Sequence, residues 1–434
     1  MLDIFNTSTP CTCGRIHPKI NVDLIVCRGA ISSLPKKLSD LKTSRAFILC
    51  DENTHRVAGG KVEALLKESS IPYSLHILKG EVIEPDEKNT EIALSAIDTS
   101  VDTVISVGSG VIGDIAKIVA KERGASLLAV ATAPSMDGYA SATSSMIQRG
   151  LKVTVSSKCP DVIIGDTDIL KTAPDKMLIS GLGDMLAKYI SIAEWRISNI
   201  VNGEYYCEKT ASIVREALRR CVENKDGLLK REDAAIEAVF FGLVLCGISM
   251  TYAGASRPAS GGEHYISHIF DMRALEFGTP SSTHGIQCAI GTLKTAELYE
   301  RLKSITPCKE KAIAYAEAFD KEQHFEFLRS FLGRSAEAMI SLETRENKYS
   351  IRKHRERIDR IIDRWDDILK AVNEEIPSSE SIRRLLSDIG CPTSLPEIGL
   401  DEDILPPAFR ATRDIRDKYV LSRLAFDLGE DLFE

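Results

Sequence analysis

Three of the eight histidines of the chain lie within 21 residues of one another. His264 and His268 are four residues apart in SRPASGGEHYISHIFDM, so on a helix they would share one face. His284 follows in PSSTHGIQCAIGTL, a glycine-flanked polar turn that precedes another apolar helical pattern. One such histidine alone is usually a structural residue, but imidazoles grouped in this way are typical ligands of a transition metal.

A carboxylate that would complete a catalytic metal site is Asp184. It stands between small residues in SGLGDMLAKYISIAEW, where an amphipathic helix is expected to start. Imidazoles together with one carboxylate hold a metal and leave a coordination position open for substrate. The alternative is that Asp184 caps the N terminus of that helix.

A glycine-rich turn, Gly108–Asp114, reads GSGVIGD and lies between a strand pattern and a helix pattern. In that context backbone N–H groups and a helix N terminus face a pyrophosphate. The turn follows a late strand, and Thr132 stands where a dinucleotide fingerprint has an acid about 20 residues on. An earlier strand ends at Asp51, which could hydrogen-bond the adenosine ribose or could cap a helix. A tight turn without a ligand is the alternative for the glycines.

The cysteines indicate a reducing compartment. There are 11 of them, an odd number without any Cys-x-x-Cys pair, so we expect free thiols and a cytoplasmic protein. The N-terminal segment lacks the pattern of a secretory signal. Cys11, Cys13 and His17 form a Cys/His group that lacks a fourth ligand, and free thiols are expected there too.

Length and charge exclude several classes. A chain of 434 residues exceeds the size at which one core stops growing, so two domains are expected. A net charge of -8 argues against a nucleic-acid partner. Residues 238–256 carry no charge and approach the length of a membrane span, but their glycines and hydroxyl residues favour a buried core helix.

Strand and helix patterns alternate between residues 22 and 132, which predicts a parallel sheet with crossover helices. The predicted strands are 22–29, 45–51, 72–78, 102–108 and 126–132. Helical patterns take over after about residue 175, at 176–199, 203–225, 230–254, 309–332 and 345–374. The sequence therefore predicts a Rossmann-like α/β domain over 1–175 and an all-α domain over 176–434. The charged pattern over 345–374 predicts a solvated helix face.

Five segments carry a family resemblance: VGSGVIGD, ATAPSMDGYASATSSM, SGLGDMLAK, SRPASGGEHYISH and THGIQCAIGTL. Together they resemble the sn-glycerol-1-phosphate dehydrogenase family, in its bacterial form, within the iron-containing alcohol dehydrogenase and dehydroquinate synthase-like superfamily. The resemblance spans about residues 20–300 and continues more weakly into PTSLPEIGLDEDILPPAFRATRDIRDKY. The most specific of the motifs is PSMDGYAS.

The resemblance implies a role for particular residues. Asp184, His264 and His284 match metal ligands, and Asp137, Asp184 and His268 are expected at the substrate as catalytic residues. The residues that match nicotinamide dinucleotide contacts are Asp51, Gly110, Val111, Ile112, Gly113, Asp114, Thr132, Ala133, Pro134, Ser135 and Ser141.

The chain also departs from the superfamily pattern. Lys188 stands where the iron members often carry a further histidine, so three protein ligands are expected. In the glycine turn, Ser109 and Val111 replace a glycine and a serine. Candidates for binding a phosphate are Arg257, Lys188 and Lys152, each of which has a structural ion pair as its alternative.

The implied reaction is the reversible, metal-dependent reduction of dihydroxyacetone phosphate by NADH or NADPH to sn-glycerol 1-phosphate. The metal would polarise the carbonyl oxygen, and zinc, nickel and iron all suit its ligands. Neither a nucleic acid nor a membrane is expected as a partner, and a homodimer or higher homo-oligomer is. The alternatives are a glycerol or other polyol dehydrogenase, a dehydroquinate synthase-type cyclase, and a nucleotide sensor without activity.

Overall fold

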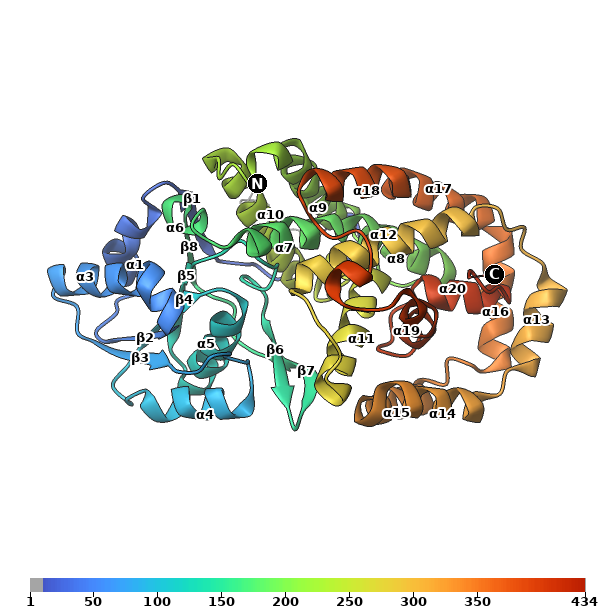
Figure 1. The fold of residues 1–434 in the computed structure, drawn as a ribbon, viewed down its shortest axis with the longest axis horizontal. Coiled ribbons are helices and arrows are strands. Elements are labelled where there is room, and N and C mark those ends of the chain that lie inside the picture. Colours follow the sequence, from blue (N-terminus) through green and yellow to red (C-terminus); the bar gives the residue numbers. More distant parts are fainter. Residues whose placement is uncertain (1–10, 434) are drawn as a thin grey trace. The chain divides into compact units, whose positions relative to one another are not determined.

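The computed structural model describes residues 11–433, which form two compact units (Figure 1). Beyond the first 14 residues, the first unit consists of Arg15–Met185 and Ser212–Ala255. The second consists of Leu186–Ala211 and Ser256–Glu434. The chain therefore crosses between the units more than once, whereas the sequence predicts a single boundary at residue 175.

The first unit contains a six-stranded sheet in which every neighbouring pair of strands is parallel. In spatial order the strands are β1 (Asp23–Cys27), β8 (Val162–Asp166), β5 (Ser126–Ala131), β4 (Thr103–Gly108), β2 (Ala46–Asp51) and β3 (Tyr73–Leu78). All five predicted strands are present, and the prediction of a Rossmann-like parallel sheet is confirmed.

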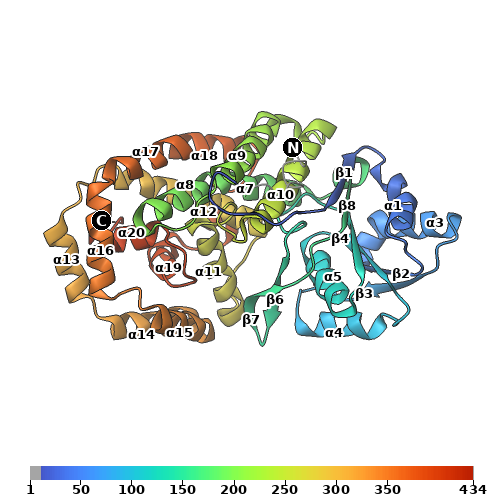
Figure 2. The same ribbon diagram turned by 180° about the vertical axis from the view of Figure 1, so that it is seen from behind.

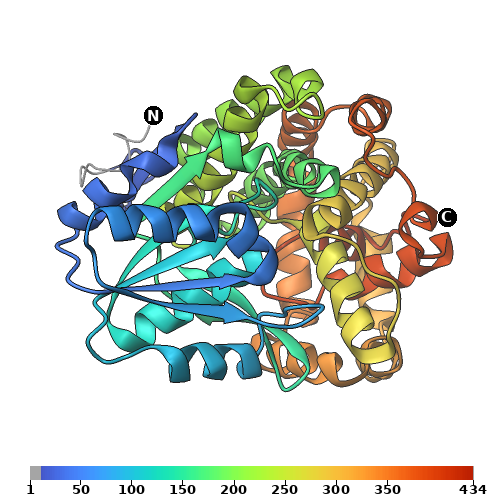
Figure 3. The same cartoon turned by 60° about the vertical axis from the view of Figure 1, so that its left-hand side comes forward.

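Helices cover both faces of this sheet, as Figure 3 shows. Successive residues of a strand point to opposite faces, so Ile48 belongs to one core and Phe47 and Leu49 to the other. The first core includes side chains of α1 (Leu34–Asp40) and α3 (Gly60–Glu68), and the second those of α4 (Glu87–Ala96) and α5 (Gly110–Arg123). Burial on both faces explains why the inner strands β2, β4 and β5 are nearly continuous apolar runs.

Three strands were not predicted. One is β8, whose five residues are buried but follow β5 without a long crossover helix. The other two, β6 (Thr143–Gln148) and β7 (Leu151–Ser156), form an antiparallel hairpin outside the main sheet (Figure 2). Its two turn residues, Arg149 and Gly150, both have positive φ, at 52° and 75°. That conformation matches the twist of a tight hairpin, and arginine is not a residue that signals it.

The apolar segment near residue 240 is the helix α10 (Asp233–Ala253). It has the length and composition of a membrane span, but 67% of its most apolar window is buried inside the protein. α10 packs against β1 and α6 (Thr167–Leu170), and a Cβ on Gly165 of β8 would lie 2.2 Å from the Phe240 ring. α10 therefore belongs to the core of the sheet unit, together with most of α7 (Asp175–Leu186) and α9 (Glu208–Glu223).

The second unit is helical in its described residues, as the sequence predicts for this part of the chain. Its main helices are α8 (Lys188–Asn202), α11 (Gly262–Phe277), α12 (His284–Leu302), α13 (Lys309–Ala318), α14 (Lys321–Leu332), α15 (Ala336–Glu346), α16 (Ile351–Asp363), α17 (Trp365–Glu375), α18 (Ser379–Asp388), α19 (Leu405–Thr412) and α20 (Leu421–Leu428).

The charged segment 345–374 differs from its prediction in two respects. It contains the separate helices α16 and α17, and not every charge on it is solvated. Arg357 is 8% exposed and donates hydrogen bonds of 2.6 and 2.8 Å to the buried carboxylate of Asp427. The pattern of charges alone does not distinguish this internal pair from surface ones.

Candidate active site

The carboxyl ends of three neighbouring strands bring the predicted dinucleotide residues to one edge of the sheet. Asp51 ends β2, Gly108 ends β4, and Thr132 follows β5. From β2 the chain moves to β3 on one side, whereas from β4 it moves to β5 on the other. In parallel sheets, ligands bind outside the carboxyl ends of strands where the winding direction changes in this way.

Asp51 is the N-cap of α2 (Glu52–Thr54), which was the structural alternative for it. Its Oδ1 accepts hydrogen bonds from the N–H and the hydroxyl of Thr54, at 2.7 and 3.0 Å. A carboxylate has several acceptor positions on two oxygens, so this cap remains compatible with a ribose contact.

The glycine turn opens directly into α5. A Cβ on Gly108 would come within 2.5 Å of Ile112, so the turn is tight, whereas a Cβ on Gly113 would meet nothing within 4 Å. Ile112 is 2% exposed and lies in the sheet core, and Val111 packs against that core. The side chains of these two residues therefore pack into the core of the first unit.

Asp114 is buried and makes internal bonds. Its carboxylate accepts bonds from Lys117 Nζ at 3.2 Å and from the N–H of Ser145 at 3.1 Å. Lys117 also donates to the carbonyls of Gly138 and Thr143. Burial raises the pKa of the Asp114 carboxyl, and the Lys117 ammonium opposes that shift. The acid therefore ties α5 to the hairpin and to the segment before it.

The segment that follows β5 is a buried loop that holds the remaining predicted dinucleotide residues. The N–H of Thr132 donates to the carbonyl of Gly108 at 3.1 Å, which joins the loop to the glycine turn. The Tyr139 hydroxyl donates to the carbonyl of Ala133 at 2.8 Å, and the hydroxyls of Ser141 and Thr143 are 2.8 Å apart. Pro134 and Ser135 lie between these anchors, within the same loop.

Helix α7 fixes this loop from one side. Ser180 Oγ donates to the carbonyl of Ser135 at 3.0 Å, and the N–H of Asp137 donates to Asp184 Oδ2 at 2.9 Å. A Cβ on Gly181 would lie 1.7 Å from the carbonyl oxygen of Pro134, so only glycine permits this approach. Asp184 lies in the last turn of α7 and not at a helix start, so its reading as an N-cap is wrong.

The three histidines lie in the second unit, at the starts of two neighbouring helices. His264 and His268 occupy successive turns of α11, and His284 is the first residue of α12. The ring centroids of His264 and His284 are 5.1 Å apart, and those of His268 and His284 are 6.2 Å apart. His264, His284 and Cys288 each present a ligating atom within 4.8 Å of those of the other two.

Buried carboxylates orient the first of these imidazoles. Glu263 Oε1 lies 2.7 Å from His264 Nδ1 and also accepts the N–H of Gly261 at 2.8 Å. Such a partner holds the proton on Nδ1 and leaves Nε2 as the ligating nitrogen. Glu194 accepts the N–H of Gly262 at 2.7 Å, and its burial, together with the nearby Glu263 carboxylate, raises its pKa to about 8. Neither acid was predicted from the sequence, although the Glu-His pair in GGEH was visible.

His284 and Cys288 are one turn apart on α12. Ser267 Oγ lies 3.4 Å from His284 Nδ1, and Cys288 Sγ lies 3.6 Å from His284 Nε2. Cys288 is fully buried. Burial alone would raise the pKa of its thiol, but the imidazoles of His264 and His284 lower it to about 7.

Comparison with known proteins agrees with this arrangement. Residues 25–174 match the family model described as iron-containing alcohol dehydrogenase. The glycerol-1-phosphate dehydrogenase [NAD(P)+] of Bacillus subtilis is 32% identical over 303 residues, which cover 68% of this chain and 77% of that protein. That of Bacillus licheniformis is 29% identical over 413 residues, covering 94% and 90%. The chain belongs to the glycerol-1-phosphate dehydrogenase family.

Solved structures show the same fold at low sequence identity. Glycerol dehydrogenase from Schizosaccharomyces pombe aligns with a TM-score of 0.61 at 17% identity, covering 95% of this chain and 89% of that one. An iron-containing alcohol dehydrogenase from Corynebacterium glutamicum aligns with a TM-score of 0.62 at 16% identity, covering 96% and 97%. Family membership makes the chain an oxidoreductase whose cofactors are a nicotinamide dinucleotide and a divalent metal. The imidazoles in the second unit and the buried carboxylate in the first are donors of the kind such a metal takes.

Two of the basic residues considered for a phosphate are structural. Arg257 is 1% exposed and donates to Glu204 at 2.8 Å, to Ser198 at 3.1 Å and to the carbonyl of Tyr419 at 3.0 Å. Lys188 is fully buried and donates to the carbonyl of Ala259 at 3.0 Å. Lys152, the third, lies on β7.

The cysteines of the N-terminal Cys/His group form no disulfide. All 11 cysteines lie among the described residues and are unbridged, as expected. His17 Nδ1 lies 2.8 Å from the carbonyl of Tyr252, and the two rings stack at 4.0 Å.

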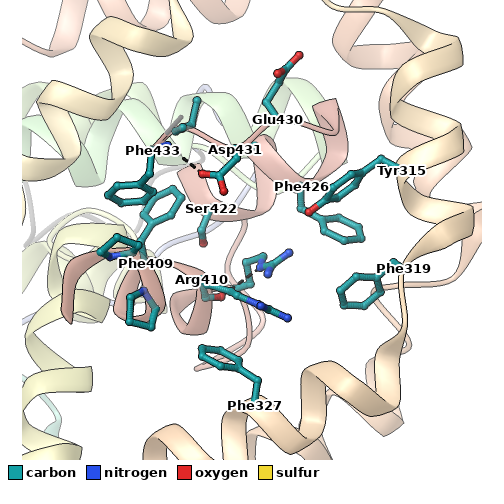
Figure 4. A pocket seen from close by; sticks show the side chains of 15 residues that line it. Tyr315, Phe319, Phe327, Phe409, Arg410, Ser422, Phe426, Glu430, Asp431 and Phe433 are labelled. Atoms are coloured by element: carbon teal, nitrogen blue, oxygen red, sulfur yellow. Dashed lines mark hydrogen bonds between the residues drawn. The ribbon is translucent and has the colours of Figure 1, made fainter. Parts of the chain in front are cut away.

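A separate cavity of about 380 Å³ lies within the second unit, between α13, α14, α19 and α20 (Figure 4). Aromatic rings line it, and two arginines stack on them: Arg410 lies 4.4 Å from the centroid of Phe327, and Arg413 lies 5.1 Å from that of Phe426. It contains none of the residues that the sequence predicts for the active site.

We expect Gly181→Ala to destabilise the protein. The new methyl group would meet the carbonyl oxygen of Pro134, and overpacking against backbone costs about 2 kcal/mol. Thermal unfolding of the purified variant measures this loss. Gly60→Ala is the matched control, because a Cβ there meets nothing within 4 Å. Equal melting temperatures for the two variants would contradict the close approach of α7.

We expect Glu263→Gln to weaken metal binding by about tenfold, because loss of this charge beside the imidazole lowers its basicity. Competition with a chromogenic chelator measures the affinity. Glu276→Gln is a control on the same helix, since Glu276 pairs with Arg334 at the surface. Unchanged affinity in the Glu263 variant would show that this acid does not act through His264.

Proposed function

We propose that the chain reduces dihydroxyacetone phosphate to sn-glycerol 1-phosphate with NADH or NADPH, reversibly, at a metal held by Asp184, His264 and His284. The observation that carries the proposal is the pair of imidazoles His264 and His284, with their rings 5.1 Å apart and the first one oriented by a buried acid. The relatives named as glycerol-1-phosphate dehydrogenases support the choice of substrate.

The carboxyl edge of the sheet is the proposed dinucleotide site. Its support is the tight turn after β4, the open surface at Gly113 and the N terminus of α5, which together suit a pyrophosphate. The Asp51 carboxylate at the end of β2 would accept hydrogen bonds from a ribose. It would repel a 2′-phosphate, so we expect NADH to be preferred over NADPH.

When bound, a divalent metal supplies Lewis-acid polarisation of the substrate oxygen, and the nicotinamide supplies the hydride. Glu263 fixes the tautomer of His264, and Ser267 lies against the non-ligating nitrogen of His284. The Asp137 N–H holds the Asp184 carboxylate in one orientation. In this proposal, these contacts would orient the donor atoms before a ligand binds.

His268 and Asp137 are the proposed substrate residues. An imidazole beside His284 can donate a proton to the substrate oxygen during reduction and accept one during oxidation. The net reaction consumes one proton and one hydride for each carbonyl reduced. The backbone N–H of Asp137 donates to the Asp184 carboxylate. We assign to the Asp137 carboxylate the binding of the substrate hydroxyl that does not react.

We expect the purified protein, supplied with zinc, nickel or iron, to oxidise NADH when dihydroxyacetone phosphate is added. A chelator should abolish the reaction. Asp184→Asn should lower kcat/KM by about a thousandfold, because polarisation by a metal is worth several kcal/mol. Asp431→Asn, at the surface of the second unit, should have no effect.

The same assay separates the alternatives. Equal activity with dihydroxyacetone would favour a glycerol dehydrogenase, whose solved examples share this fold. Binding of NADH without turnover of any ketone would favour a cyclase or a sensor. Stereospecific analysis of the product distinguishes the 1-phosphate from the 3-phosphate.

We expect Gly113→Ala to weaken NADH binding by at least about tenfold without loss of folding stability. The methyl group would occupy open space where the pyrophosphate approaches, and alanine favours a helix by about 1 kcal/mol over glycine. Fluorescence titration with NADH and thermal unfolding of the same sample measure both effects. Wild-type affinity in a stable variant would place the dinucleotide elsewhere.

A further inference from the structure

We propose that Cys288 is a further ligand of the active-site metal, contributing a thiolate sulfur beside His264 and His284. This inference rests on the metal site of the proposed function and adds a fourth protein donor to it, so that the substrate oxygen would bind as a fifth ligand.

The first support is the spacing on α12. His284 and Cys288 are four residues apart, so they lie on one face of the helix. Cys288 Sγ lies 3.6 Å from His284 Nε2. A sulfur and a nitrogen on one tetrahedral zinc ion, at bond lengths of about 2.3 and 2.0 Å, are about 3.5 Å apart. The observed separation, which a thiol–imidazole hydrogen bond holds in this structure, thus matches that of two ligands of one ion.

The second support is the grouping of three donors in one unit. One ligating atom each of His264, His284 and Cys288 lies within 4.8 Å of the other two. His264 is held by Glu263, and His284 by Ser267, on the ring nitrogen that would not bind a metal. The sulfur thus lies beside imidazoles that are already oriented as ligands.

The environment of Cys288 differs from that of another buried cysteine in the same unit. Cys391 is 4% exposed and follows the end of α18, next to a surface turn that contains Glu397. Cys288 is completely buried between imidazoles. On metal binding, the sulfur–metal bond would replace the S–H bond, and the thiol proton would leave to solvent.

A sulfur donor has a consequence for metal choice. Thiolates favour zinc and cobalt over hard ions such as magnesium, which prefer oxygen. Loss of the thiolate should therefore weaken zinc binding more than it weakens binding of a harder ion.

The test is cobalt substitution of the full-length protein. Thiolate ligation of Co²⁺ produces a sulfur-to-metal charge-transfer band in the near ultraviolet, which nitrogen and oxygen ligands do not give. We expect this band at one equivalent of cobalt in the wild type. We expect Cys288→Ser to lose it while it keeps the visible bands of bound cobalt, and to bind zinc at least about tenfold more weakly.

Controls separate this inference from the proposed function. Cys391→Ser should keep the band. The melting temperature of Cys288→Ala shows whether removal of the sulfur unfolds the protein, which would be another cause of a lost band. Bound cobalt without the band, or a band that persists in Cys288→Ser, overturns the role of Cys288 and leaves the metal site intact. A wild-type protein that binds no cobalt overturns the metal site and this inference together.

Discussion

The hydrogen bond from the Asp137 N–H to the Asp184 carboxylate is the constraint on which the first unit depends. Asp184 is fully buried, and a buried carboxylate costs several kcal/mol unless polar groups or a cation compensate its charge. The Asp137 N–H compensates part of that cost, and a metal ion bound there would compensate a further part. The bond is possible because Gly181 lets α7 approach the Pro134 carbonyl. On the other side, Gly247 of α10 lets that helix approach the Asp137 carbonyl, where a Cβ would lie 2.8 Å away.

The second unit also contains buried carboxylates, and backbone N–H groups stabilise them there. Glu263 and Glu194 are both buried, and both accept backbone N–H groups at the start of α11. A helix N terminus carries partial positive charge, which stabilises acids there. Burial and, after it, the nearby Glu263 carboxylate raise the pKa of Glu194 to about 8. The result is a rigid carboxylate support behind His264, which fixes the imidazole without a bound ligand.

Features of this structure that depend on neighbouring residues were predictable from the sequence, and features that depend on residues far apart along the chain were not. The strands β2, β4 and β5 were predictable because burial on both faces makes them short, continuous apolar runs. The edge strands β1 and β3 are only partly buried, but they are still rich in apolar residues. The β6–β7 hairpin was not, since its turn uses Arg149 in a conformation that arginine rarely adopts. The metal candidates His264 and His284 were visible as a cluster in the sequence. Glu194 was not, because its partners Gly262 and Leu421 are 68 and 227 residues away along the chain.

Lys188 and Cys288 both bear on the ligand set that we propose for the metal. Lys188 stands where the family resemblance leads us to expect a further histidine, and its ammonium is buried against the Ala259 carbonyl. That bond fixes the loop that leads into α11, so Lys188 supports the histidine helix. A site that loses an imidazole binds a metal less tightly unless another donor replaces it. A sulfur on α12, one turn from His284, is such a donor, and it needs no movement of the backbone. The lysine and the cysteine would then be two parts of one change in ligand set, from nitrogen toward sulfur.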